Sequence, residues 1–142
     1  MSTIGNILWF IVGGFFMGLA WWILGLFAFI TIIGIPWGRA CFVVGQLAFF
    51  PFGKEVISRQ LISKTSDIGT GSLGLVGNII WFVAAGFWLA LAHMASALLY
   101  CITIIGIPFG IQHFKLARIA LAPIGKSVVT KELAAATRQQ NS

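Results

Sequence analysis

Five basic side chains inside the apolar stretches of this sequence are of types that can do chemistry: Arg39, His93, His113, Lys115 and Arg118. A charged side chain at the centre of a bilayer costs at least about 2.5 kcal/mol, so such residues usually face a partner or a water-filled cavity. One interpretation is that they line a path that favours anions. The other is that the cations lie near helix ends and extend to the phosphate groups of lipid headgroups.

The residues needed for catalysis are scarce. The three acidic residues all stand in polar segments: Glu55, Asp67 and Glu132. The sequence holds no Ser-His-Asp set and no HExxH motif, and its two cysteines form no CxxC pair. The Gly-Lys pairs at 53–54 and 125–126 lack the first glycine of a phosphate-binding loop. We therefore expect no enzymatic activity, no cofactor and no metal site.

The elements that position these residues are expected to be membrane helices. Hydrophobic residues make up 59% of the 142 residues and charged residues 8%, whereas soluble domains average about 25% charged residues. The net charge is +6, but no run of five or six like charges marks a nucleic-acid-binding tail. The basic excess is typical of cytoplasmic loops in membrane proteins. We therefore expect the lipid bilayer and its anionic headgroups as partners, and no nucleic acid.

An internal direct repeat organises the chain, because residues 5–57 align with residues 77–129 without a gap. The block Thr-Ile-Ile-Gly-Ile-Pro at 31–36 returns unchanged at 103–108. A repeat of this length indicates that one ancestral unit was duplicated. The predicted organisation is a first repeat, a polar cytoplasmic linker, a second repeat and a short cytoplasmic tail, at residues 4–57, 58–75, 76–129 and 130–142.

Each unit contains a long apolar run, a break at Gly-Ile-Pro and a shorter run, with the breaks at Pro36 and Pro108. As a helix, the long run is long enough to cross a hydrocarbon layer of ~30 Å. The short run is long enough when the preceding Thr-Ile-Ile-Gly-Ile-Pro block is added to it, which places a proline near the start of the helix. We predict an all-α membrane protein with two tandem repeats, each a helical membrane hairpin, and about four membrane segments in total.

The basic residues bear on the topology, because they lie in the middle segment and the C-terminal segment: Lys54, Arg59, Lys64, Lys126, Lys131 and Arg138. Both segments are therefore expected on the cytoplasmic side. A hairpin in each unit gives this arrangement, with both termini cytoplasmic. One crossing per unit, with the short run lying as an interfacial helix, would separate the two segments. A re-entrant hairpin folded inside each long run, with the short run interfacial, keeps the two segments on one side and is not excluded by the charges.

Two further sets of residues occupy matched positions in the repeats. Asn6 and Asn78 begin the long runs and are expected to be helix N-caps. Small residues spaced by four allow helix backbones to approach closely, and the glycines of this kind are Gly14, Gly18, Gly34, Gly38, Gly86, Gly106 and Gly110. They serve packing within the chain or contacts in an oligomer.

The paired Thr-Ile-Ile-Gly-Ile-Pro blocks, the Asn-Ile-x-Trp-Phe starts and the Pro-x-Gly-Lys ends resemble the YccF family, whose bacterial members contain two inner membrane component domains. The resemblance extends from about Ile4 to Val129. It implies a multi-pass protein of the bacterial inner membrane, and it implies no activity and no site residues.

Two functions fit these observations. The first is a homo-oligomeric channel or permeation component, in which Arg39, His113, Lys115 and Arg118 favour anions. Four short helices are too few to enclose a wide path, so this hypothesis requires an oligomer. The second is a structural or accessory protein that binds a larger membrane partner or anionic lipid through its basic face.

Overall fold

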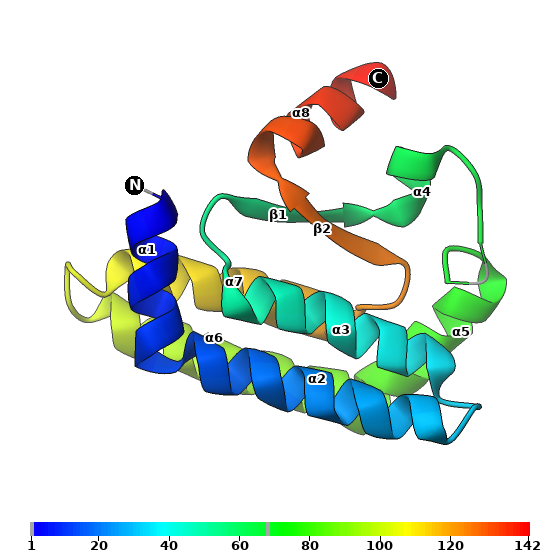
Figure 1. Ribbon diagram of the computed structural model, residues 1–142, viewed down its shortest axis with the longest axis horizontal. Helices are drawn as coiled ribbons and strands as arrows, with labels where there is room; N and C mark the ends of the chain where they lie inside the picture. Colours follow the sequence, from blue (N-terminus) through cyan, green and yellow to red (C-terminus); the bar gives the residue numbers. More distant parts are fainter. Residues whose placement is uncertain (1, 68) are drawn as a thin grey trace.

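Each repeat folds into a long helix, a tight turn and a shorter returning helix (Figure 1). The structure is a computed structural model that describes residues 2–67 and 69–142. The first repeat contains α1 (Ser2–Trp9), the π-helix η1 (Phe10–Gly14), α2 (Phe15–Ile30) and α3 (Ile35–Phe49). The second contains α5 (Ser72–Trp81), η2 (Phe82–Gly86), α6 (Phe87–Cys101) and α7 (Ile107–Leu121). The predicted helical hairpin is therefore present in both repeats.

The turn between α2 and α3 explains the repeated Thr-Ile-Ile-Gly-Ile-Pro block. The hydroxyl of Thr31 donates to the carbonyl of Ala28 (2.7 Å) and accepts from the backbone N–H of Gly34 (3.0 Å). A Cβ atom on Gly34 would lie 2.5 Å from the Ala28 oxygen, so a larger residue does not fit. Pro36 lies in the first turn of α3, where no backbone N–H is needed. The second repeat forms the same turn, in which Thr103 bonds Gly106 and Pro108 begins α7.

The expectation of an all-α protein is wrong in one respect, because the two repeats share a two-stranded antiparallel ribbon. Strand β1 (Lys54–Ser58) pairs with β2 (Lys126–Thr130), and the register is centred on the pair Val56 and Val128. These two valines occupy the same place in their repeats, so a local twofold axis relates the repeats at the ribbon. A strand of five residues is not stable alone, and the duplication supplies its partner.

The ribbon begins at matched turns. Gly53 and Gly125 have φ values of 77° and 84°, a left-handed conformation that favours glycine. Each turn is closed by a backbone bond, from Lys54 N–H to Pro51 and from Lys126 N–H to Pro123. Short helices follow the strands, α4 (Arg59–Ser63) after β1 and α8 (Lys131–Gln140) after β2.

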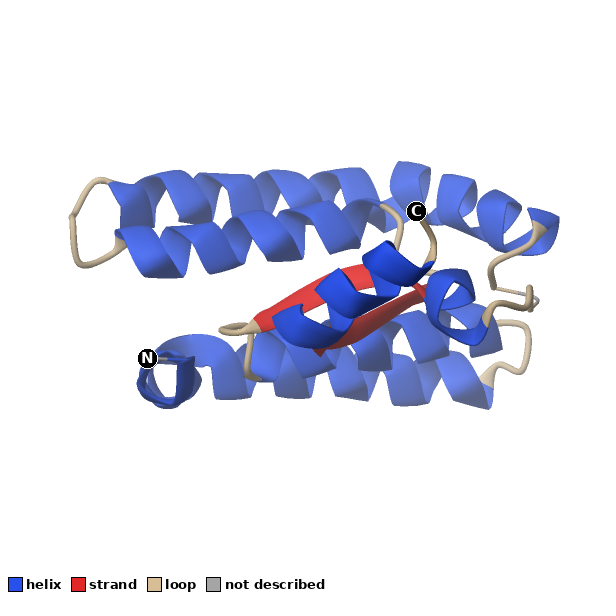
Figure 2. Ribbon diagram, turned by 90° about the horizontal axis from the view of Figure 1, so that it is seen from above, coloured by secondary structure: helices blue, strands red, loops and turns tan. Residues whose placement is uncertain are grey.

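The elements form layers (Figure 1). Helices α3 and α7 contact the ribbon, α8 lies on the outer side of the ribbon, and α2 and α6 lie on the side of the molecule away from it. Seen from above, the two hairpins lie side by side and their turns point to opposite ends of the molecule (Figure 2). The ribbon therefore places both basic segments on one side of the helices.

An asparagine at the same position of each repeat holds the long helix to the turn after the hairpin, and these bonds correct the N-cap prediction. Asn6 lies inside α1, where its side chain donates to the carbonyl of Phe52 (3.0 Å) and accepts from the N–H of the same residue (2.8 Å). Asn78 makes the same two bonds with Ile124, at 3.1 and 2.9 Å. Both asparagines therefore satisfy the backbone of the turn before the ribbon instead of a helix N-terminus.

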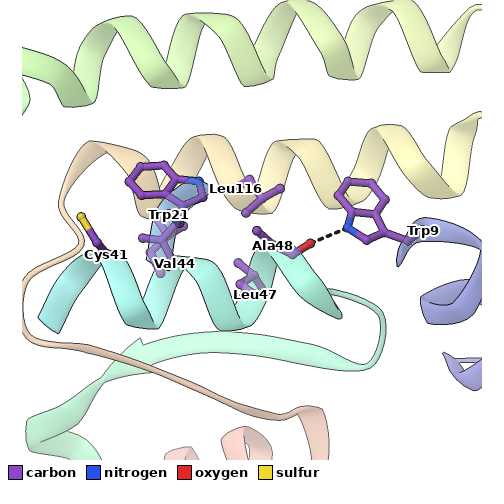
Figure 3. Packing of buried hydrophobic residues seen from close by; sticks show 8 residues of the cluster. Trp9, Trp21, Cys41, Val44, Leu47, Ala48 and Leu116 are labelled. Atoms are coloured by element: carbon purple, nitrogen blue, oxygen red, sulfur yellow. Dashed lines mark hydrogen bonds between the residues drawn. The ribbon is translucent and has the colours of Figure 1, made fainter. Parts of the chain in front are cut away.

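Tryptophans make a second matched link. The indole N–H of Trp9 donates to the carbonyl of Ala48 at 2.6 Å (Figure 3), and that of Trp81 donates to Ala120 at 2.7 Å. The Trp9 ring also lies 4.9 Å from the ring of His113 in the other repeat. The core thus joins the repeats, and Trp21, Val44, Leu47 and Leu116 are buried within it (Figure 3).

Helix contacts within the chain surround the small residues predicted for packing. A Cβ atom added to Gly38, Gly86 or Gly110 would lie within 3 Å of a backbone oxygen of the facing helix. At Gly14 and Gly18 it would meet the rings of Trp9 and Phe49. Gly34 and Gly106 lie in the hairpin turns. These contacts account for the glycines without an oligomer.

Large apolar side chains cover the surface of α2, α6 and the hairpin turns. Phe16 is 73% exposed and Ile104 is 87% exposed, whereas soluble monomers rarely expose wide apolar patches. Two helices are long and apolar enough to cross a membrane, Ser2–Ile30 and Ser72–Cys101. The first is interrupted at Gly13, whose backbone is not helical, and the chain bends there so that α1 and α2 run in different directions (Figure 1).

Candidate functional site

A cavity of about 350 Å³ lies between α7, the ribbon and α8. Its wall is mostly basic, with six cationic side chains and one carboxylate. The lining residues are Lys54, Glu55, Val56, Ile111, Gln112, Lys115, Arg118, Ile119, Lys126, Lys131 and Arg138. The cavity therefore combines charges from α7, from both strands of the ribbon and from α8.

Helix α7 presents one face to the cavity. Gln112, Lys115 and Arg118 follow one another at intervals of three residues, which places them along one side of a helix. Leu116 and Ala120 are buried on the other side, in the core. This side of α7 is therefore the polar face of an amphipathic helix that contacts the ribbon.

Lys115 reaches from the second repeat to the first. Its ammonium group donates to the carbonyl of Pro51 at 2.6 Å and to that of Lys54 at 3.0 Å. An ammonium group has three protons, so one donor remains for a ligand in the cavity. The two bonds fix the position of the charge beside the turn that leads into β1.

Burial lowers the pKa of the Lys115 ammonium from 10.5 to about 8. The positive charge of Lys131 acts in the same direction, and the carboxylate of Glu55 opposes it. The charged form of Lys115 is thus less favourable in the cavity than in water. An anion placed beside it would relieve this cost.

Glu55 supplies the negative charge in the cavity wall. Its carboxylate forms an ion pair with Arg138, which links β1 to α8. The hydrogen bond from Arg138 is the main cause that holds the pKa of Glu55 below its ordinary value. Glu55 therefore stays ionised at neutral pH and neutralises part of the basic wall.

The chemistry of the cavity suits the binding of an anion. Lysine and arginine donate hydrogen bonds and accept none, so these side chains match phosphate oxygens. The side chain of Gln112 is buried, and its amide N–H group donates to Pro108 at 3.1 Å. Its amide oxygen has no partner among the described residues. In the described part of the chain, no three His, Cys, Asp or Glu side chains gather as a metal site.

The structure brings together two of the four residues predicted to contact anions. Lys115 and Arg118 share the cavity. Arg39 is exposed and lines a separate pocket with Arg59, whose guanidinium binds Asp67 at 2.9 Å. His113 is buried away from both, with its Nδ1 3.2 Å from Nδ1 of His93. The four residues therefore do not share one cavity within the chain.

Four further cations line the cavity: Lys54, Lys126, Lys131 and Arg138. The sequence predicts them on the basic cytoplasmic face, without indicating that they lie beside Lys115 and Arg118. Their convergence depends on the ribbon, which the sequence analysis missed. A signal was present, because Lys54–Ser58 and Lys126–Thr130 are rich in β-branched residues and each follows a glycine turn.

The fold and the site define a membrane protein of two helical hairpins that are joined by a ribbon, with a basic cavity between α7, the ribbon and α8. The family model named YccF, described as an inner membrane component domain, matches residues 4–54 and 76–126. Two relatives named inner membrane protein YccF, from Escherichia coli K12 and Shigella flexneri, are each 41% identical to the whole chain, which covers 97% of their length. The chain belongs to the YccF family.

The comparisons confirm the resemblance and the two repeats predicted from the sequence. The names of the relatives support a place in the inner membrane. No solved structure matches the chain, so the cavity is described from this structure alone.

Proposed function

We propose that this chain is an accessory protein of the inner membrane that binds anionic lipid headgroups through the basic cavity. The cavity carries the proposal, because it lies between the apolar helices and the polar cap formed by the ribbon and α8. Anionic headgroups occupy the same level in a membrane, between hydrocarbon and water. Basic pockets at this level bind the head groups of anionic lipids.

The arrangement of the hairpins supports a topology in which they lie within one leaflet over one with four crossing segments. Helix α3 has 15 residues, so it is about 23 Å long at 1.5 Å per residue, less than the ~30 Å of the hydrocarbon layer. The two hairpin turns point in opposite directions, and both expose isoleucines (Figure 2). Hairpins that lie along the cytoplasmic leaflet keep both turns in lipid and both basic segments at the cytoplasmic surface.

Cysteine labelling tests this topology in the full chain. In a background with Cys41→Ala and Cys101→Ala, Ile33→Cys and Ile105→Cys place thiols in the hairpin turns. Neither turn should react with a membrane-impermeant maleimide from either side, whereas the control Lys64→Cys should react from the cytoplasmic side. Labelling of one turn from the periplasm and of the other from the cytoplasm would establish crossing hairpins, because the two turns lie at opposite ends of the molecule.

Lipid binding by the purified full-length protein tests the function. We expect native mass spectrometry in a neutral detergent to show tighter binding of phosphatidylglycerol than of phosphatidylcholine. Each charge-assisted hydrogen bond contributes about 1.5–3 kcal/mol, so Lys115→Gln with Arg118→Gln should weaken phosphatidylglycerol binding at least about tenfold. Arg39→Gln is the matched control, because Arg39 lies outside the cavity. Equal binding of the two lipids would overturn the proposal.

A homo-oligomeric anion path is the second candidate. The exposure of Arg39 and Arg118 favours it, since each side chain is open to a neighbouring subunit. Proteoliposomes should then pass a halide current that falls in Arg39→Ala. A monomer in nanodiscs, together with no halide flux, would reject this function and leave lipid binding unaffected.

A further inference from the structure

We propose that the cavity binds a ligand that carries two phosphate groups, and that Glu55 is an internal counter-ion that gives up Arg138 when this ligand binds. The inference rests on the proposed function, because it specifies which anionic headgroup the cavity takes. The shared chemistry is a pair of phosphates joined in one molecule, as in cardiolipin or in a soluble diphosphate.

The charge of the wall supports two phosphates. Six cations face one carboxylate, which leaves an excess of five positive charges. One lipid phosphodiester carries a single negative charge and would leave most of this excess without a counter-ion. Uncompensated charges in a partly buried site are costly, so a ligand with at least two negative charges is the better complement.

The positions of the cations support the same conclusion. Lys115 and Arg118 stand on α7, Lys131 and Arg138 belong to α8, and the ribbon carries the other two lysines. The donors therefore come from separate walls of the cavity. Its volume of about 350 Å³ lies within the ~300–1,000 Å³ of ordinary ligand pockets. One phosphate beside α7 and one beside α8 would use both groups of donors.

The carboxylate of Glu55 neutralises one positive charge of the cavity wall through its ion pair with Arg138. The ion pair joins β1 to α8 across the wall of the cavity. A phosphate near Arg138 competes with this carboxylate for the same guanidinium. Glu55 is thus a built-in competitor, and removing its charge should strengthen the binding of the ligand.

The two repeats differ at the cavity, although they share a fold. The counterparts of Lys115 and Arg118 in the first repeat are Val43 and Gln46, and the counterpart of Glu55 in the second repeat is Ser127. The first repeat forms its hairpin without counterparts of Lys115 and Arg118, and the second repeat forms its strand without a counterpart of Glu55. Neither the hairpin nor the strand therefore requires these charges. Beside the two bonds that Lys115 makes to the first repeat, the third proton of its ammonium group and the guanidinium of Arg118 are available to a ligand in the cavity.

The test compares cardiolipin with phosphatidylglycerol at equal phosphate content in nanodiscs of the full-length protein, with phosphatidylcholine as the neutral background. We expect cardiolipin to bind at least about tenfold more tightly, which corresponds to one additional charge-assisted contact. Glu55→Gln should tighten cardiolipin binding, and Lys115→Gln with Arg118→Gln should reduce the preference to within about twofold. Arg39→Gln should keep the preference. A soluble arm measures pyrophosphate against inorganic phosphate.

The outcomes separate this inference from the proposed function. A cardiolipin preference that depends on Lys115 and Arg118 supports both. Tighter binding of pyrophosphate than of phosphate, without any preference among lipids, supports the diphosphate site with a soluble ligand and rejects the lipid function. Equal binding of the two anionic lipids, with no preference for pyrophosphate, overturns the inference and leaves the lipid function standing. Absence of all anion binding overturns both.

Discussion

Replacing Asn78 with alanine removes two hydrogen bonds that hold the second long helix to the turn before β2. Both bonds go to the backbone of Ile124, which is 4% exposed, so its N–H and C=O groups would lose their partners away from water. Each unsatisfied buried group costs about 1–3 kcal/mol. Alanine recovers about 0.5 kcal/mol because it suits a helix interior better than asparagine does. The expected loss in the free energy of unfolding is therefore about 1.5–5.5 kcal/mol.

Thermal unfolding of the full-length protein in detergent measures this loss. A change of 1 kcal/mol corresponds to roughly 3–4 °C for a chain of this size, so Asn78→Ala should lower the Tm by about 5–22 °C. Asn6→Ala should cost less, because Phe52 is only partly buried and its backbone can reach water. The two effects should add, since the bonds share no partner. Ser96→Ala is the control, because its hydroxyl donates within an exposed helix turn.

A loss below about 0.5 kcal/mol in Asn78→Ala would refute this reasoning, because changes of that size are typical of surface positions without structural roles. It would mean that Ile124 finds other partners when the asparagine is removed. Equal losses in the free energy of unfolding for Asn6→Ala and Asn78→Ala would refute only the expectation that the more buried turn loses more.

Three further predictions concern single positions. Because burial lowers the pKa of Lys115 to about 8, anion affinity should fall as the pH rises from 7 to 9, and Lys115→Gln should abolish this fall in a binding titration. In the unfolded chain this lysine keeps its proton up to about pH 10.5. The free energy of unfolding should therefore rise with pH between about 8 and 10.5. Trp81→Phe removes the donor to Ala120 and should cost about 1 kcal/mol in thermal unfolding. Gly110→Ala should cost about 1–3 kcal/mol because its Cβ would lie 2.8 Å from a backbone oxygen of α6, whereas Gly13→Ala, with open space around it and an extended φ, should leave the Tm unchanged.

The sequence predicted the parts of the fold that depend on local patterns. Within six residues, the Thr-Ile-Ile-Gly-Ile-Pro block has a threonine that bonds the preceding helix, a glycine that packs against a backbone oxygen and a proline suited to the first turn of a helix. The hairpin turn could therefore be located at residues 31–36. The apolar runs indicated the helices on either side. The repeat could be found because it requires only that the sequence be aligned with itself.

The contacts between distant segments could not be predicted in the same way. Asn6 bonds a turn that lies 46 residues further along the chain, and at the start of an apolar run an asparagine looks like an N-cap. The strands of the ribbon are five residues long, so their period is hard to distinguish from a loop. Lys115 and Arg118 were recognised by their charge, but the other cations of the cavity join them only through pairing of the strands.

The comparison of the two repeats separates residues that maintain the fold from residues that serve the cavity. The asparagine bonds, the indole bonds and the glycines with positive φ occur in both repeats. Lys115 and Arg118 occur in the second repeat alone. Two copies of one ancestral unit must each fold, so a feature that both keep is explained by folding. A charged group that one copy holds at a cost in burial, and the other copy replaces with a neutral residue, needs a different explanation, and binding of an anion supplies it.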